Sequence, residues 1–241
     1  MRVAKQKKEF TEHEKLFTSL ADGVSHTFLQ LTRLSEEARF IPGSQDEQWA
    51  AVRDLTGASL QLLESYVHLM RLHGGTAQPL LEPVAVTSLL YDTLHMLEPY
   101  AKQYQVDLAI DIPPSLEPVV SDRAILQSAL LSLGQVFIGA QSESEHEQRV
   151  LSLGAHKGRY GIVAGWYGQG YELSARALTR ARRLHGRVQQ PLHELVSGSA
   201  SGVFIADGLL ASISSQLHVA RYHNTAGLAA TLPACHQLQL V

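Results

Sequence analysis

Residues 87–112, TSLLYDTLHMLEPYAKQYQVDLAIDI, change their apolar period half-way along. From Thr87 to Tyr104 the apolar residues recur every three or four positions, which predicts an amphipathic helix. From Val106 to Ile112 apolar and polar residues alternate, which predicts a half-buried strand. The change of period therefore predicts a domain in which a helix covers one face of a sheet.

Both patterns continue along the rest of the chain. Ser121 and Asp122 are able to cap a helix that runs to about Gly139. The sequence then predicts a hairpin of 150–153 and 160–166 that turns at 156–159, a basic helix near 172–185, a helix near 202–217 and a closing hairpin around 224–227. The expected fold class is α+β, an α/β sandwich with a mostly antiparallel sheet and helices on one face.

The residues before this domain predict a helical hairpin. Residues 17–38 fit a heptad, and Pro42 and Gly43 supply a turn. The second helix has one apolar stripe, made by Val52, Leu55, Leu62, Tyr66 and Leu69. A hairpin alone cannot bury two stripes, so we expect a second copy of the chain to complete a dimeric four-helix bundle. The alternative is that the stripes pack on the rest of the same chain.

A glycine- and proline-containing segment, HGGTAQP at 73–79, separates the two parts of the chain. We expect a dimerising helical hairpin over 10–74 and the sandwich domain over 80–237.

Composition excludes several classes of protein. The net charge of −3 provides no basic field for nucleic acid or for an anionic membrane. The single cysteine, Cys235, excludes a disulfide framework and fits a reducing compartment. The best apolar run, 203–213, is too short to span a membrane and contains Asp207. We therefore expect a cytoplasmic protein with no membrane span of its own.

Residues 17–33, FTSLADGVSHTFLQLTR, resemble the phosphoacceptor box of sensor histidine kinases, and His26 matches the phosphorylated histidine of that family. The heptad places His26 two residues after the core position Val24, so its side chain is expected to point outward. The alternative is a plain surface histidine, one of twelve in the chain.

The resemblance extends over about 15–234, because 62–133 and 198–233 are similar in order and spacing to the second helix, the linker and the ATPase-domain elements of the family. It implies a helical hairpin followed by an ATPase-type α/β sandwich. It also implies a response regulator receiver domain or a histidine kinase as partner.

The positions that bind nucleotide in the family are altered. The two asparagines of the metal-binding helix fall on Ser132 and Val136, and valine offers no oxygen to Mg²⁺. The adenine-reading aspartate falls on Trp166, which cannot accept a hydrogen bond from the adenine amino group. Around it the family glycines remain, as Gly168 and Gly170, and in the last glycine box as Gly198 and Gly202. We therefore expect no ATP binding and no cofactor.

The phosphoacceptor box is altered as well. Thr27 stands where the family has an acidic general base, and threonine cannot take a proton near neutrality. Gln30 stands where many members orient water for dephosphorylation, and it either holds a water there or is only solvated.

Arginines provide the candidate docking residues. Arg176, Arg180, Arg183 and Arg187 recur every three or four residues and form one basic helical face, and Arg33 follows His26 by two turns. The face is either merely solvated, or it binds an acidic partner or a phosphate. No pair of histidines has metal-ligand spacing, so no metal site is expected.

Three functions are compatible with these residues. The first is a histidine phosphotransferase that exchanges phosphoryl between His26 and response-regulator aspartates without ATP. The second is a pseudokinase scaffold that binds a kinase or a regulator and carries no phosphate. The third is an active histidine kinase with an unorthodox ATP site. We favour the first.

Overall fold

The structure is a computed structural model, which describes residues 28, 31, 45–142, 149–169, 175–184 and 201–235. The predicted first helix, 17–38, therefore lies almost wholly outside the described residues. The division of the chain into 10–74 and 80–237 stays a prediction.

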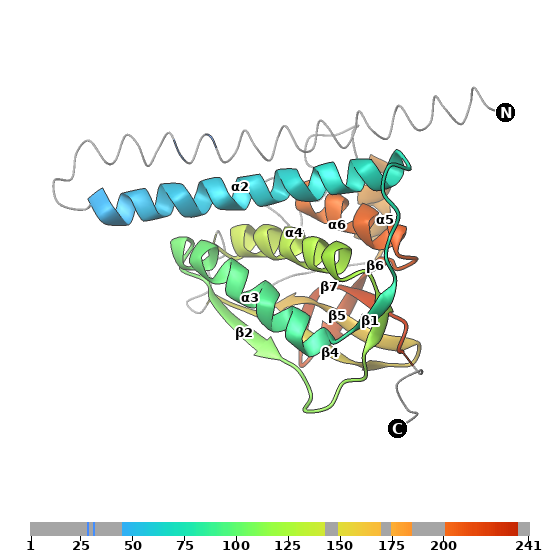
Figure 1. Cartoon of the computed structure of the whole chain (residues 1–241). Helices are drawn as coiled ribbons and strands as arrows, with labels where there is room; N and C mark the ends of the chain where they lie inside the picture. The colour runs from blue at the N-terminus through green and yellow to red at the C-terminus, as the bar shows by residue number, and fades with distance from the viewer. Residues whose placement is uncertain are drawn as a thin grey trace.

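A five-stranded sheet forms the base of the molecule (Figure 1). Its strands lie in the order β2 (Asp107–Asp111), β4 (Val150–Gly158), β5 (Gly161–Gly168), β7 (Thr225–Leu232) and β6 (Leu217–Tyr222). Only β2 and β4 are parallel, so the expectation of a mostly antiparallel sheet is confirmed. A two-stranded sheet of β1 (Glu82–Val84) and β3 (Val119–Ser121) was not predicted.

Helices cover one face of this sheet (Figure 1). They are α3 (Val86–Gln103), α4 (Arg123–Ser142), α5 (Ala175–Leu184) and α6 (Ser201–Ser212). The predicted cap of α4 is confirmed for Asp122, whose Oδ1 accepts a hydrogen bond from the Ile125 backbone N–H at 3.0 Å. Helix α4 is long and apolar enough to cross a membrane, but 78% of its apolar window is buried inside this fold. A buried core helix passes the same test, so this is weak evidence for a span.

Helix α2 (Gln45–His73) lies along the helical layer, on the side away from the sheet (Figure 1). Tyr66 and Leu69 belong to the core of the sandwich, and Leu69 packs on Gly208 of α6. The Gln135 side chain of α4 donates hydrogen bonds to the Ala58 carbonyl at 3.0 Å and to the Gln61 amide oxygen at 3.3 Å. For this part of the stripe, packing within one chain is therefore the alternative that the structure adopts.

Two predicted boundaries were wrong. The first hairpin does not turn at 156–159, because His156, Lys157 and Gly158 still pair with β5 and only two residues separate the strands. The last helix does not reach 217. It ends at Ser212, because Ser214 adopts a left-handed φ of 59° and the Ser215 N–H bonds back to the Leu210 carbonyl at 2.9 Å.

Candidate functional site

Two altered nucleotide positions and one retained glycine of the resemblance meet between α4 and α6. Ser132 and Val136 lie one helical turn apart on α4, and Gly202 lies in the first turn of α6. A Cβ added to Gly202 would collide with the Ser132 carbonyl oxygen and with a methyl of Val136. Gly202 is therefore used here for close contact between two helices, since only glycine leaves room for it.

Trp166 lies on the other side of α4. It belongs to β5, its side chain is fully buried, and its indole Nε1–H donates to the Leu130 carbonyl of α4 at 2.8 Å. Its ring lies against Gly134, where an added Cβ would be only 2.8 Å from Cζ2 and 2.9 Å from Cε2. The indole thus fills the space between the sheet and α4, and its only donor is satisfied.

These side chains do not fit a magnesium nucleotide. Trp166 and Val136 provide no acceptor for adenine and no oxygen for Mg²⁺. The one hydroxyl, from Ser132, is 1% exposed and has no hydrogen-bond partner within the described part of the chain. Gly168 is buried at the end of β5, whereas Gly170 and Gly198 lie outside the described residues.

The basic helix is present, as α5, and Arg182 attaches it to α6. The Arg182 guanidinium donates to both carboxylate oxygens of Asp207, at 2.8 and 2.6 Å, and to the Leu217 carbonyl at 2.6 Å. The hydrogen bond to Asp207 is the main reason why the pKa of Arg182 is raised above its ordinary value, against the opposing effect of burial. Arg182 is therefore structural, and sequence spacing alone did not separate it from its neighbours.

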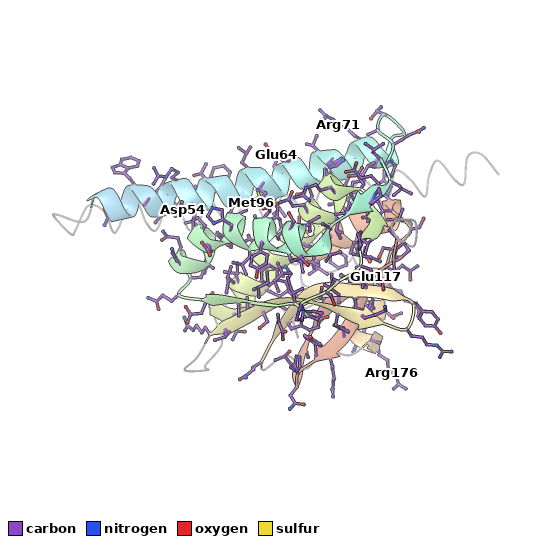
Figure 2. All side chains as sticks on the ribbon, turned by 60° about the horizontal axis from the view of Figure 1, so that its bottom comes forward. Asp54, Glu64, Arg71, Met96, Glu117 and Arg176 are labelled. Atoms are coloured by element: carbon purple, nitrogen blue, oxygen red, sulfur yellow. The ribbon has the colours of Figure 1, made fainter. Side chains whose placement is uncertain are left out.

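The other arginines of α5 form the exposed basic face. Arg176, Arg180 and Arg183 line, with Thr179, an open hollow of about 450 Å³. Arg176 extends away from the body of the molecule (Figure 2). The structure therefore brings three of the predicted docking residues together, while Arg187 lies outside the described residues.

The phosphoacceptor residues His26, Gln30 and Arg33 also lie outside the described residues. Of that segment the structure describes Phe28 and Leu31 as helical. Within the described residues, no group of three or more histidine, cysteine or acidic side chains is able to hold a metal ion.

Sequence reasoning missed two residues that shape this region. Gly134 provides the space for the indole, and Gln135 ties α4 to α2. A glycine inside an apolar helix was the only available signal for the first. Nothing in the sequence near Gln135 indicates its partners, which lie more than 70 positions earlier in the chain.

No family model and no curated protein matches the chain in sequence. Its fold is similar to those of solved histidine kinases. The match to the Acinetobacter baumannii histidine kinase AdeS has a TM-score of 0.54 at 10% identity and covers 89% of this chain and 98% of AdeS. The match to full-length ShkA in complex with AMPPNP has a TM-score of 0.55 at 17% identity and covers 97% of this chain but only 46% of ShkA. The chain therefore has a histidine-kinase-like core fold, with a helical N-terminal part and an ATPase-type α/β region.

Proposed function

We propose that the chain is a two-component phosphotransfer protein, which exchanges a phosphoryl group between His26 and aspartates of response regulators without ATP. The observation that carries the proposal is Trp166. A histidine-kinase-like fold has a buried indole, bonded to the Leu130 carbonyl, at the position where the resemblance expects the adenine-reading aspartate. With nucleotide excluded, His26, whose side chain is expected to point outward from the heptad, is left with phosphoryl transfer from a protein donor.

The proposed reaction needs little from this chain. A ring nitrogen of neutral His26 attacks the phosphorus of the regulator's phosphoaspartate, so that an N–P bond forms. The P–O bond to the aspartate breaks, and the carboxylate leaves with its electron pair. The reverse reaction passes the phosphoryl group to the aspartate of a second regulator. Neutral imidazole is populated near pH 7, and the regulator's own Mg²⁺ stabilises the charge on the phosphoryl group.

Docking supplies the remaining contribution, because positioning converts a bimolecular reaction into an effectively unimolecular one. We propose that Arg33 contacts the regulator beside His26. The face of Arg176, Arg180 and Arg183 offers a second contact for an acidic surface, because α5 is held in place by the Arg182–Asp207 pair. Such regulators are expected in the cytoplasm.

We also propose that the active form is a homodimer. Tyr66 and Leu69 are buried within the chain, but a second row of large apolar side chains on α2 is exposed, made by Trp49, Leu60, Leu63 and Val67. Leu60, 55% exposed, is followed at spacings of three and four by Leu63 and Val67, so these residues share one side of the helix. A second copy would cover this row.

Sedimentation tests the dimer. At micromolar concentration the parent chain is expected at about twice 26.4 kDa. Leu63→Lys should produce a folded monomer, because Leu63 is exposed within one chain, whereas Leu62→Lys should unfold the protein, because Leu62 packs against its core. A monomeric parent chain would refute the proposed interface.

A scaffold without phosphate chemistry is the second candidate. The Gln135 hydrogen bonds and the contact of Leu69 with Gly208 join α2 to the sandwich, which favours one continuous surface for a partner. Such a protein would bind a kinase or a regulator, and His26 would be neither phosphorylated nor needed for binding.

The decisive experiment incubates the full chain with phosphorylated response regulators of the host. Acid-labile label on the parent chain, lost in His26→Ala and retained in the control His95→Ala, supports phosphotransfer; His95 is an exposed histidine of α3. Tight regulator binding without any label, unchanged in His26→Ala, would exclude phosphotransfer and support the scaffold. Label that requires only Mg-ATP would overturn the claim that the nucleotide site is lost.

A further inference from the structure

The face of the sheet that points away from the helices has a small aromatic cluster of its own. Alternate residues of a strand point to opposite faces, so Trp166 enters the main core while Tyr167 points to the other face. Tyr167 is nevertheless fully buried. Its ring lies over Gly154 of the neighbouring strand, where a Cβ would be 3.4 Å away. Something other than the helices therefore covers this tyrosine.

The cover is the tip of the β6–β7 hairpin, residues 222–225. Tyr222 stacks on His156 of β4, with ring centroids 4.4 Å apart and planes 6° from parallel, and its ring centroid lies 5.6 Å from that of Tyr167. His223 packs edge-on against Tyr222 at 4.2 Å, and its Nε2 lies 3.7 Å from the Asp111 carboxylate of β2. Strands β7 and β5 separate β6 from β4, so the tip reaches across the sheet.

The backbone of the tip forms a regular two-residue hairpin turn. His223 and Asn224 adopt left-handed φ angles of 44° and 62°, which a two-residue hairpin turn requires. The Thr225 hydroxyl hydrogen-bonds to the Tyr222 carbonyl across the turn. The turn is therefore a defined structure, and its contacts with β4 and β2 decide whether it lies on the sheet.

His156 stands at the centre of those contacts. Its Nδ1 is buried and has no hydrogen-bond partner in the part of the chain that the structure describes. Burial, followed by the nearby His223, lowers the pKa of His156; Asp111 opposes this, and His218 adds to it. Tyr222 of β6 stacks on its ring and Tyr167 of β5 packs against Tyr222, and burial raises the pKa of both tyrosines. Among the described residues, the carboxylate that favours protonation of His156 is that of Asp111, and this carboxylate also lies 3.7 Å from His223.

We propose that the tip of the β6–β7 hairpin is a pH-sensitive latch: it lies closed over Tyr167 while His156 is neutral, and it opens when His156 is protonated. In the closed latch a proton on His156 would be half-buried beside the rings of His223 and His218, both of which disfavour it. Opening returns His156 to water and exposes the Tyr167 ring beside Gly154. The latch is independent of His26 and of the proposed phosphotransfer.

The direction follows from proton linkage. A histidine with a lowered pKa in the closed state binds fewer protons there than in the open state. The closed state is therefore fully favoured above the ordinary histidine pKa of about 6.5 and loses stability as the pH falls below it. The opening equilibrium constant therefore rises between pH 7.5 and pH 5.5, by at most about tenfold, the limit in which the closed state takes up no proton.

Hydrogen exchange of the full chain tests the latch. Protection of the amides of 219–228, corrected for intrinsic rates, should fall from pH 7.5 to pH 5.5, by at most about tenfold, while that of the α4 amides stays unchanged. His156→Phe keeps a ring to stack on Tyr222 but cannot be protonated, so it should remove most of this pH response. His95→Gln, at an exposed histidine outside the cluster, should retain it.

Several outcomes would overturn the latch. Equal protection of the tip in the parent chain at both pH values would do so, as would a full pH response in His156→Phe. Where His156→Phe does not fold, titration of the His156 ring by NMR in the parent chain decides. The ring should titrate in step with the tip amides, and tip amides that change at a different pH would refute the proposal.

Discussion

Replacing Gly134 by alanine tests how Trp166 is packed. The new Cβ would lie 2.8 and 2.9 Å from two carbons of the indole, whereas carbon atoms in contact are ordinarily separated by about 3.5–4.0 Å. It would also collide with the end of the Leu97 side chain. Leu97 is able to rotate, but the indole cannot move without weakening its 2.8 Å hydrogen bond to the Leu130 carbonyl.

The magnitude is set by two opposing effects. Overpacking a core in this way costs about 1–3 kcal/mol. Alanine in place of glycine inside a helix stabilises by about 1 kcal/mol. The net expectation for Gly134→Ala is therefore a loss of up to about 2 kcal/mol in the free energy of unfolding. Gly139→Ala is the matched control on the same helix, because no atom lies within 4 Å of its new Cβ, and it should stabilise by up to about 1 kcal/mol.

Urea denaturation followed by circular dichroism measures both variants. The two should differ by about 1–3 kcal/mol, or by several degrees in the midpoint of thermal unfolding for a chain of this size. Trp166→Phe should reduce the difference, because the smaller ring removes the atoms that the new methyl group meets. Equal stabilisation by both alanines would refute the packing of the indole on Gly134, and with it the structural basis for the proposal that the chain binds no nucleotide.

Three further predictions concern other groups. Tyr167→Phe should raise the free energy of unfolding by about 1 kcal/mol, because the buried hydroxyl lacks a partner among the described residues; a destabilised variant in urea denaturation would indicate a bound water. Asp207→Asn should cost about 1 kcal/mol after allowance for solvent, since it weakens the partly exposed pair with Arg182; an unchanged urea midpoint would contradict this. Calorimetric titration with Mg-ATP should detect no binding below millimolar concentration, either in the parent chain or in Trp166→Asp, and a micromolar dissociation constant in the parent would refute the loss of the site.

Local patterns predicted those parts of the fold that depend on neighbours in the sequence. The change of period at 87–112 predicted α3 and β2, and the recurring arginines predicted α5. The sequence also predicted the helix cap at Asp122, because the capping carboxylate and the Ile125 N–H that it accepts from are only three residues apart. The unfavourable chemistry of Val136 and Trp166 for a nucleotide followed from residue type alone.

Local sequence patterns did not predict contacts between residues that are far apart in the chain. The apolar stripe of α2 is equally suited to a second copy of the chain and to the sandwich, and the contact with Gly208 of α6 is what places Leu69 in the sandwich. Four strands contribute to the cluster around His156, and one of them, β6, is separated from the other three in the sheet by β7. An apolar period states which side of an element is buried, but the partner that buries it is determined by packing over the whole chain.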